Sequence, residues 1–243
     1  MHFGSYFDSD YEASFIMFSA SHWIGLIVVI FLCFMLYRSR KAIRGRESLR
    51  RGVRWSLVAV LLASEALLQL WYVSEGIWRS GLSLPLELCG ITLLLSIIML
   101  TTRSRLLYPF LYFAGIAGAS IALLTPSLDY AFPHFRFFLF FVAHAAIILA
   151  SLYMTWIEDY RPTWKSLSYS MLGINLVAAF VWWANSVLDA NYMFLMRKPG
   201  SFSFLDYFGP YPYYLLVEEL FAFVLFVLMY AFFFKRRKGA DGR

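Results

Sequence analysis

The chain has 243 residues and a formal net charge of +6. Hydrophobic residues make up 61% of it and charged residues 15%, whereas a soluble domain carries about 25% charged residues. This composition excludes an ordinary soluble domain, and the length leaves no room for a second domain. We therefore predict a single all-α integral membrane domain over residues 1–243.

Seven apolar stretches follow one another along the chain. Each is close to the ~20 residues that a helix needs to cross the hydrocarbon core of a bilayer. They cover residues 21–37, 53–78, 83–101, 106–125, 135–157, 166–187 and 212–234. The sequence predicts a polytopic membrane helical bundle with seven transmembrane helices.

Most of the 21 Lys and Arg residues lie in alternate gaps between these stretches. The basic gaps contain Arg38, Arg40, Lys41, Arg44, Arg46, Arg50, Arg51 and Arg54, then Arg103 and Arg105, then Arg161 and Lys165, and finally Lys235, Arg236, Arg237, Lys238 and Arg243. The other gaps contain Arg79, Arg136, Arg197 and Lys198. Because cytoplasmic loops carry the excess of Lys and Arg, the pattern places the N-terminus outside and the C-terminus in the cytoplasm. These basic residues are expected to meet anionic lipid, and we expect no nucleic-acid partner.

One thiol and one imidazole lie at comparable depth in the predicted outer half of the bundle. Cys89 is about six residues into the third stretch and His144 about nine into the fifth. At a rise of 1.5 Å per residue, the two residues lie about 9 Å and 14 Å below the outer ends of their helices. Cys89 also follows Pro85 near the start of its helix, and a helix N-terminus and a nearby imidazole both activate a thiol as a nucleophile. The alternative is that Cys89, like Cys33, is a small buried hydrophobic side chain.

Several carboxylates and amides also fall inside or near the apolar stretches, and such groups usually face the bundle interior. They are Glu65, Glu75, Glu87, Asn175, Asn185, Glu218 and Glu219. Some can simply reach the membrane interface. A seven-helix transporter, or a protein that binds lipid or solute without covalent catalysis, is therefore the alternative to an enzyme.

The outer loops are rich in aromatic residues and proline, which predicts a rigid rim with Arg197 and Lys198 placed to meet a lipid phosphate. The sequence contains neither HExxH nor CxxC, so we predict no metal site. It also lacks a GxSxG elbow, a Walker loop and a dinucleotide fingerprint, and we expect no cofactor.

Four segments resemble the YwaF-like family of bacterial integral membrane proteins. They are LPLELC at 84–89, YFAGIAGASIALLTP at 112–126, FPHFRFFLFFVAH at 132–144, and NYMFLMRKP with FGPYPYY across 191–214. That family looks like a bacterial branch of the group containing the animal transmembrane acyltransferase that remodels ether phospholipids. It is more distantly similar to intramembrane hydrolases of fatty-acid esters that use Thr and His.

The resemblance implies an intramembrane acyltransferase or acyl-ester hydrolase in the bacterial cytoplasmic membrane. Its partners would be membrane lipids, as acyl donor and acceptor. The matching positions give a Cys89 nucleophile with His144 as general base, and Asn191, Tyr192 or an outer-loop amide would stabilise the oxyanion. The family pattern has His where Glu87 stands, a difference that is compatible with an intact thiol and implies either the loss of a second polar contact or a different substrate.

Overall fold

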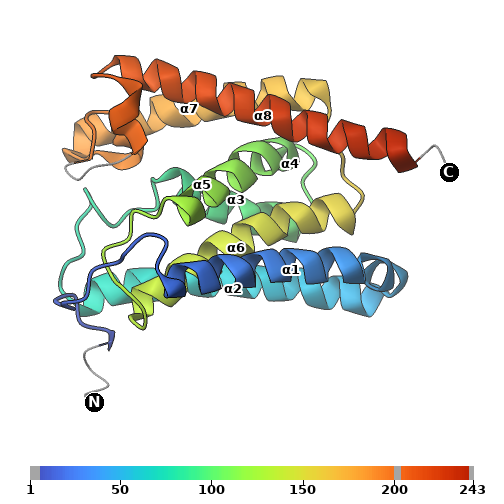
Figure 1. The fold of residues 1–243 in the computed structure, drawn as a ribbon, viewed down its shortest axis with the longest axis horizontal. Helices are drawn as coiled ribbons and strands as arrows, with labels where there is room; N and C mark the ends of the chain where they lie inside the picture. The colour runs from blue at the N-terminus through green and yellow to red at the C-terminus, as the bar shows by residue number, and fades with distance from the viewer. Residues whose placement is uncertain (1–5, 200–203, 241–243) are drawn as a thin grey trace.

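Long α-helices run side by side through the chain, of which the computed structural model describes residues 6–199 and 204–240 (Figure 1). The helices are α1 (Ala20–Gly45), α2 (Glu47–Ser74), α3 (Leu88–Thr102), α4 (Leu107–Phe110), α5 (Ile116–Leu124), α6 (Phe135–Trp156), α7 (Trp164–Leu188) and α8 (Tyr213–Ala240). A π-helical turn, η2 (Leu111–Gly115), joins α4 to α5 in one rod, and 3-10 turns η3 (Tyr192–Phe194) and η4 (Phe204–Phe208) precede α8. The predicted all-α bundle is confirmed.

Six of these rods are long and apolar enough to cross a membrane, and α3 is an apolar helix of 15 residues. At 1.5 Å per residue α3 spans about 22 Å, less than the ~30 Å hydrocarbon core. The prediction that this helix starts at residue 83 was wrong, because a residue that precedes proline disfavours helical geometry and Leu84 precedes Pro85. The two ends of the described chain still lie at opposite ends of the bundle, as an odd number of crossings requires (Figure 1).

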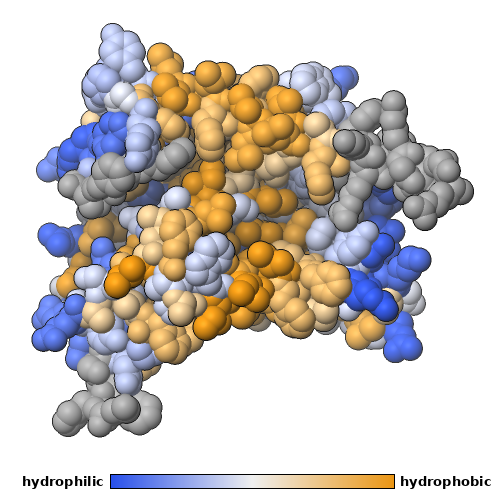
Figure 2. Space-filling view, viewed as in Figure 1, coloured by the Kyte–Doolittle hydropathy of each residue, from blue (hydrophilic) through white to orange (hydrophobic). Residues whose placement is uncertain are grey.

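The surface has the pattern of a membrane protein. Hydrophobic residues form a broad central band and hydrophilic residues gather at both ends of the helices (Figure 2). Large apolar side chains such as Ile30, Leu176 and Phe232 are exposed. Water would penalise so much exposed apolar surface, whereas lipid tails would not. The chain is therefore a multi-pass membrane protein.

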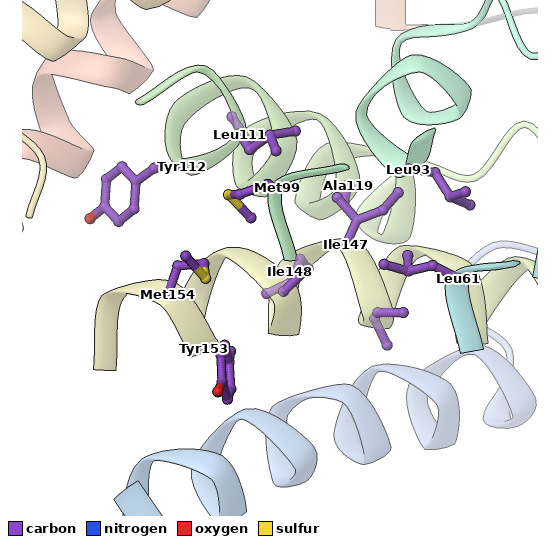
Figure 3. Packing of buried hydrophobic residues seen from close by; sticks show 14 of the residues in the cluster. Leu61, Leu93, Met99, Leu111, Tyr112, Ala119, Ile147, Ile148, Tyr153 and Met154 are labelled. Atoms are coloured by element: carbon purple, nitrogen blue, oxygen red, sulfur yellow. The ribbon is translucent and has the colours of Figure 1, made fainter. Parts of the chain in front are cut away.

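Helix α6 lies at the centre and packs against α1, α2, α3 and α5 (Figure 1). Its buried face carries small residues, including Ala146, Ala150 and Ser151, which let neighbouring helices approach closely. Gly25 of α1 lies directly against Phe141, where a Cβ atom would stand 2.5 Å from a ring carbon. Large side chains such as Met99, Ile147 and Tyr153 fill the remaining core (Figure 3).

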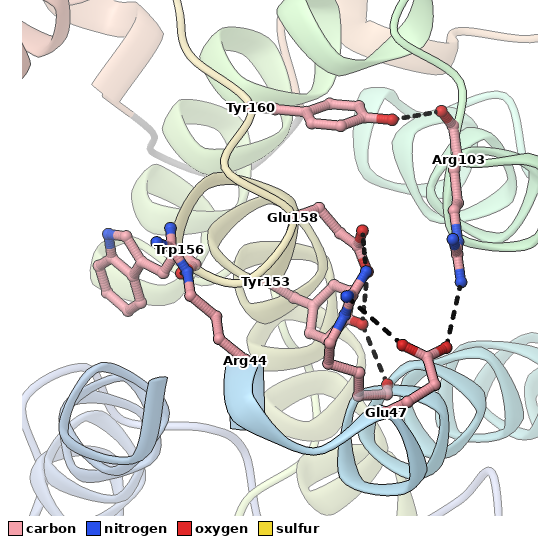
Figure 4. A network of polar contacts seen from close by, with 8 residues as sticks. Arg44, Glu47, Arg103, Tyr153, Trp156, Glu158 and Tyr160 are labelled. Carbon is pink, nitrogen blue, oxygen red and sulfur yellow. Dashed lines mark hydrogen bonds and ion pairs between the residues drawn. The ribbon is translucent and has the colours of Figure 1, made fainter. Parts of the chain in front are cut away.

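Charged and hydroxyl side chains tie the loops together at the end of the bundle predicted to be cytoplasmic (Figure 4). Arg50 donates to Glu158 at 2.9 Å, and the hydroxyl of Tyr153 donates both to Glu158 at 2.9 Å and to the Arg50 carbonyl at 3.0 Å. Arg44 pairs with Asp159 at 3.0 Å. The start of α2 is thereby fixed against the end of α6.

The opposite end, which is predicted to be the outer one, is covered by residues 6–19, which lie against the loop before α6. The Ser9 amide donates to the Glu75 carboxylate at 2.8 Å, and the Trp71 indole donates to the Phe7 carbonyl at 2.6 Å. His134 contacts the Asp8 carbonyl at 3.1 Å. Glu75, predicted as a polar group near the outer end of α2, thus anchors this covering segment.

Candidate active site

Cys89 lies in the first turn of α3, at its second residue. Glu87 precedes the helix in an extended conformation, with φ of −66° and ψ of 151°, and its side chain does not cap the helix. The amides of the first helical turn have no intrahelical acceptor. Within the described residues, the amides of Cys89 and Gly90 make no hydrogen bond. Two free N–H donors therefore flank the thiol.

Gly90 allows the chain before α3 to fold back onto the helix. A Cβ atom at this position would stand 3.0 Å from the carbonyl carbon, the Cα and the oxygen of Pro85. Backbone atoms cannot swing aside as side chains do, so a larger residue would push the 84–87 segment away from α3. The spacing of Pro85 and Gly90 thus sets where the thiol stands.

His144 lies near the middle of α6 and is buried. Its Nδ1 atom is 2.7 Å from the Phe140 carbonyl oxygen, which can only accept, so Nδ1 donates. In the neutral imidazole the lone pair is then on Nε2, which makes no hydrogen bond with any described residue. This tautomer is the one that a general base requires.

Helices α3 and α6 pack on each other, which brings Cys89 and His144 onto neighbouring elements. The described contacts include no hydrogen bond between Sγ of Cys89 and the imidazole. Because α3 starts at Leu88, the thiol lies one residue into its helix, not six. The Cys–His pair therefore stays a prediction.

Tyr192 is held rigidly in the loop after α7. Its hydroxyl donates to the Ser80 carbonyl and accepts from the Leu84 amide, both at 2.9 Å. The Asn185 side chain accepts from the Tyr192 amide at 2.9 Å and donates to its carbonyl at 3.0 Å. The Tyr192 hydroxyl is thus engaged on both sides, and in this arrangement it positions the segment that leads to Cys89.

Asn191 and Glu87 shape the same loop. The Asn191 side chain accepts from the amides of Met196 and Arg197, both at 3.1 Å, and donates to the Arg197 carbonyl at 2.8 Å. The exposed Glu87 carboxylate accepts from the Met193 amide at 2.9 Å. Glu87 therefore links the start of α3 to the loop at 191–195, a contact that no local sequence pattern indicates.

Arg197 and Lys198, the two basic residues of the predicted rim, differ in their contacts with the protein. Arg197 is exposed, and its guanidinium makes no hydrogen bond or ion pair in the described part of the chain. Lys198 lies 3.5 Å from Asp206 and 5.7 Å from the centre of the Tyr214 ring. Of the two, Arg197 is the one whose charged group has no partner among the described residues, and its contact with a lipid phosphate stays a prediction.

The mid-membrane polar residues of the sequence have protein partners. Glu65 accepts from Gln69 at 2.8 Å, and Gln69 also donates to the Ser83 carbonyl at 2.7 Å. Asn175 donates to Glu219 at 2.8 Å between α7 and α8. Among residues 6–199 and 204–240 no three His, Cys, Asp or Glu side chains lie close enough to hold a metal ion.

An apolar groove of about 620 Å³ runs between α1 and α6. Gly25, Val29 and Leu32 line it from α1, and Phe141 and Ala145 from α6. His144 stands between those last two residues in sequence. The groove has the lining that suits a hydrocarbon chain.

The fold and this site define a polytopic helical membrane protein with a candidate thiol site near one end. The sequence profile of the TMEM164 family matches residues 17–230, so the chain belongs to that family. An uncharacterized protein of Treponema pallidum (strain Nichols) is 29% identical over 170 residues, which cover 68% of this chain and 66%, just under two thirds, of that protein. No solved structure matches the chain.

Proposed function

We propose that this protein transfers or hydrolyses lipid acyl groups through Cys89 in the outer half of a bacterial cytoplasmic membrane. The observation that carries the proposal is the Cys89 thiol beside two free backbone amides at the start of α3. Membership of the TMEM164 family supports it, as does the resemblance of the chain to the animal acyltransferase that remodels ether phospholipids.

In the first step, the Cys89 thiol gives its proton to Nε2 of His144 and its sulfur attacks the acyl carbonyl of a phospholipid. The bond between the carbonyl carbon and the glycerol oxygen then breaks, and that oxygen takes the proton from His144. The products are a lysophospholipid and a thioester on Cys89. The step requires Nε2 to reach the thiol directly or through one water molecule, and such contacts often tighten only when substrate binds.

In the second step, a hydroxyl group of a lysolipid or of water gives its proton to His144 and attacks the thioester. The sulfur leaves and regains a proton from His144. The free amides of Cys89 and Gly90 hold the developing negative charge on the acyl oxygen in both steps, in the manner of an oxyanion hole. The groove between α1 and α6 accommodates an acyl chain, and Arg197 meets the lipid phosphate at the surface.

The test is to trap the thioester. Purified protein in lipid is incubated with an alkyne-tagged long-chain acyl donor, and mass spectrometry locates acyl groups that hydroxylamine removes. We expect the label on Cys89, its loss in His144→Ala, and an unchanged label in the control Cys33→Ala. Folded protein that carries no label with several donor classes would overturn the proposal.

The transporter alternative predicts that Glu65, and not Cys89, is the residue on which function depends. If a translocation path were the function, Glu65→Gln would impair it far more than Cys89→Ala, because Glu65 is an ionisable group inside a span. Under the acyl-transfer proposal Glu65→Gln keeps the hydrogen bond to Gln69 and leaves the acyl label intact.

A further inference from the structure

Arg54 on α2 is more buried than every other basic residue from Arg38 to Arg51. It is 9% exposed, whereas its seven neighbours in that set are exposed or half-buried. Its guanidinium makes no hydrogen bond or ion pair with any described residue, and its Nε atom is enclosed without a partner. The positive-inside pattern explains a basic residue here, but not its burial.

A buried guanidinium without a counterion is unfavourable, so buried charges in proteins are normally paired. The nearby arginines follow that rule, since Arg44 pairs with Asp159 and Arg50 pairs with Glu158. Both carboxylate oxygens of Glu158 are already used, one by Arg50 and one by the Tyr153 hydroxyl. No carboxylate of the described residues forms an ion pair with Arg54.

Two further donors, one on α2 and one on α3, lack acceptors among the described residues. The enclosed Nε of Arg50, one turn earlier on the same face of α2, has no partner, and neither has the buried Oγ of Ser96 on α3. Helices α2 and α3 pack together in opposite directions. By helix rise, Arg54 lies about 10 Å from the inner end of α2, and Ser96 about 9 Å from the inner end of α3. Arg54 and Ser96 thus lie at similar depth on two helices that pack together.

The excess of positive charge at this end and the depth of Arg54 indicate which kind of anion would accept its hydrogen bonds. The ion pairs of this end join four arginines, Arg44, Arg50, Arg103 and Arg161, to three carboxylates, Glu47, Glu158 and Asp159, and Arg54 adds a further positive charge. Positive charge is therefore in excess. The apolar stretch of α2 starts at residue 53, so Arg54 lies where the phosphate groups of a bilayer begin.

We propose that Arg54, with Arg50 and Ser96, binds a phosphate-type anion at the predicted cytoplasmic end of the bundle. A guanidinium binds two phosphate oxygens through parallel N–H groups, and a serine hydroxyl donates to a third. The anion is the headgroup phosphate of an anionic lipid or a free phosphate, and both present the same oxygens. This site is separate from Cys89 and does not depend on the acyl chemistry.

The test compares the thermal unfolding midpoint of purified protein in detergent with and without anions. One arm adds inorganic phosphate at constant ionic strength, and the other adds short-chain phosphatidylglycerol with phosphatidylcholine as its comparison. A ligand that binds only the folded state raises the midpoint with concentration. We expect such a rise in the wild type, and the arm in which it occurs identifies the source of the phosphate.

Arg54→Gln should weaken the anion at least tenfold, whereas the matched control Arg51→Gln, an exposed arginine on the same helix, should bind as the wild type does. Should Arg54→Gln not fold, Arg54→Lys keeps the charge but loses the planar fork, and it should bind several-fold more weakly. No midpoint rise in either arm would overturn the proposal. Equal losses in Arg54→Gln and Arg51→Gln would also overturn it, because they would indicate general surface charge.

Discussion

The two ends of the bundle are stabilised in different ways. At the predicted cytoplasmic end, ion pairs such as Arg50–Glu158 and Arg44–Asp159 join the loops. At the outer end, most links are hydrogen bonds between uncharged groups, such as Asn185 with the backbone of Tyr192. Polar groups that hold the fold are paired at both ends. Groups without a partner among the described residues, such as the Cys89 thiol with its flanking amides and the Arg54 guanidinium, are therefore where function is best sought.

Removing the central carboxylate of the cytoplasmic end should give the largest loss of stability. Glu158→Ala removes the acceptor that the half-buried Arg50 side chain and the Tyr153 hydroxyl share, and leaves Arg50 only the more exposed Glu47 at 3.4 Å. Breaking a buried pair by removing one partner is strongly destabilising, and for this partly buried pair we expect about 2 to 3 kcal/mol. Chemical unfolding in detergent measures it. A loss as small as that of a surface substitution would show that the network does not stabilise this end.

The corresponding test of the outer end is Asn185→Leu. It removes both hydrogen bonds to the Tyr192 backbone and leaves a buried amide and carbonyl unsatisfied, which should cost about 2 kcal/mol. Loosening Tyr192 also loosens its contact with the Leu84 amide, so acyl labelling of Cys89 should fall as well. The neighbouring exposed Ser186→Ala is the control, and an equal effect from it would contradict this account.

The outer end should also respond to pH through His134. Burial lowers the pKa of His134 below its ordinary value, so the folded state binds this proton less readily than the unfolded state. Stability should therefore be fully present above about pH 6.5 and decline as pH falls below that value. The thermal unfolding midpoint between pH 7.5 and 5.5 measures this. His134→Gln should flatten the profile, and an unchanged profile in that variant would rule His134 out.

The smallest effect is expected from Asp159→Ala. Asp159 pairs with Arg44 and Arg161, but its side chain is 52% exposed. Exposed ion pairs contribute about 0.2 to 1 kcal/mol and are screened by salt. We expect the low end of that range in chemical unfolding, and no difference from wild type at high salt. A loss as large as that of Glu158→Ala would show that exposure does not govern this network.

Hydropathy alone predicted most of the fold, since a span must be apolar over its whole length. The stretch 135–157 became α6 and 166–187 became α7 with ends shifted by only one or two residues. Hydropathy failed at 83–101, because Leu84 is apolar and yet precedes a proline that prevents helix there. The lesson is that local backbone chemistry sets the start of a helix when both sides of the boundary are apolar.

The candidate site was less accessible to sequence reasoning. Cys89 stood out because it follows a helix start. Asn191 and Tyr192 were predicted to contact the substrate by stabilising the oxyanion, but their side chains are engaged in holding the loop. Their partners are distant in sequence or are backbone groups, which leave no pattern. In the sequence Arg54 was one of eight basic residues in the same gap, and only the structure shows that it is the buried one.

The most direct test of the acyl-transfer account is the release of lysophospholipid from a diacyl phospholipid by reconstituted protein. The account predicts at least a thousandfold lower rate in Cys89→Ala than in wild type, because no other group supplies the nucleophile. Cys33→Ala, in the middle of α1, should retain the wild-type rate. Equal rates in folded Cys89→Ala and wild-type protein would contradict the account.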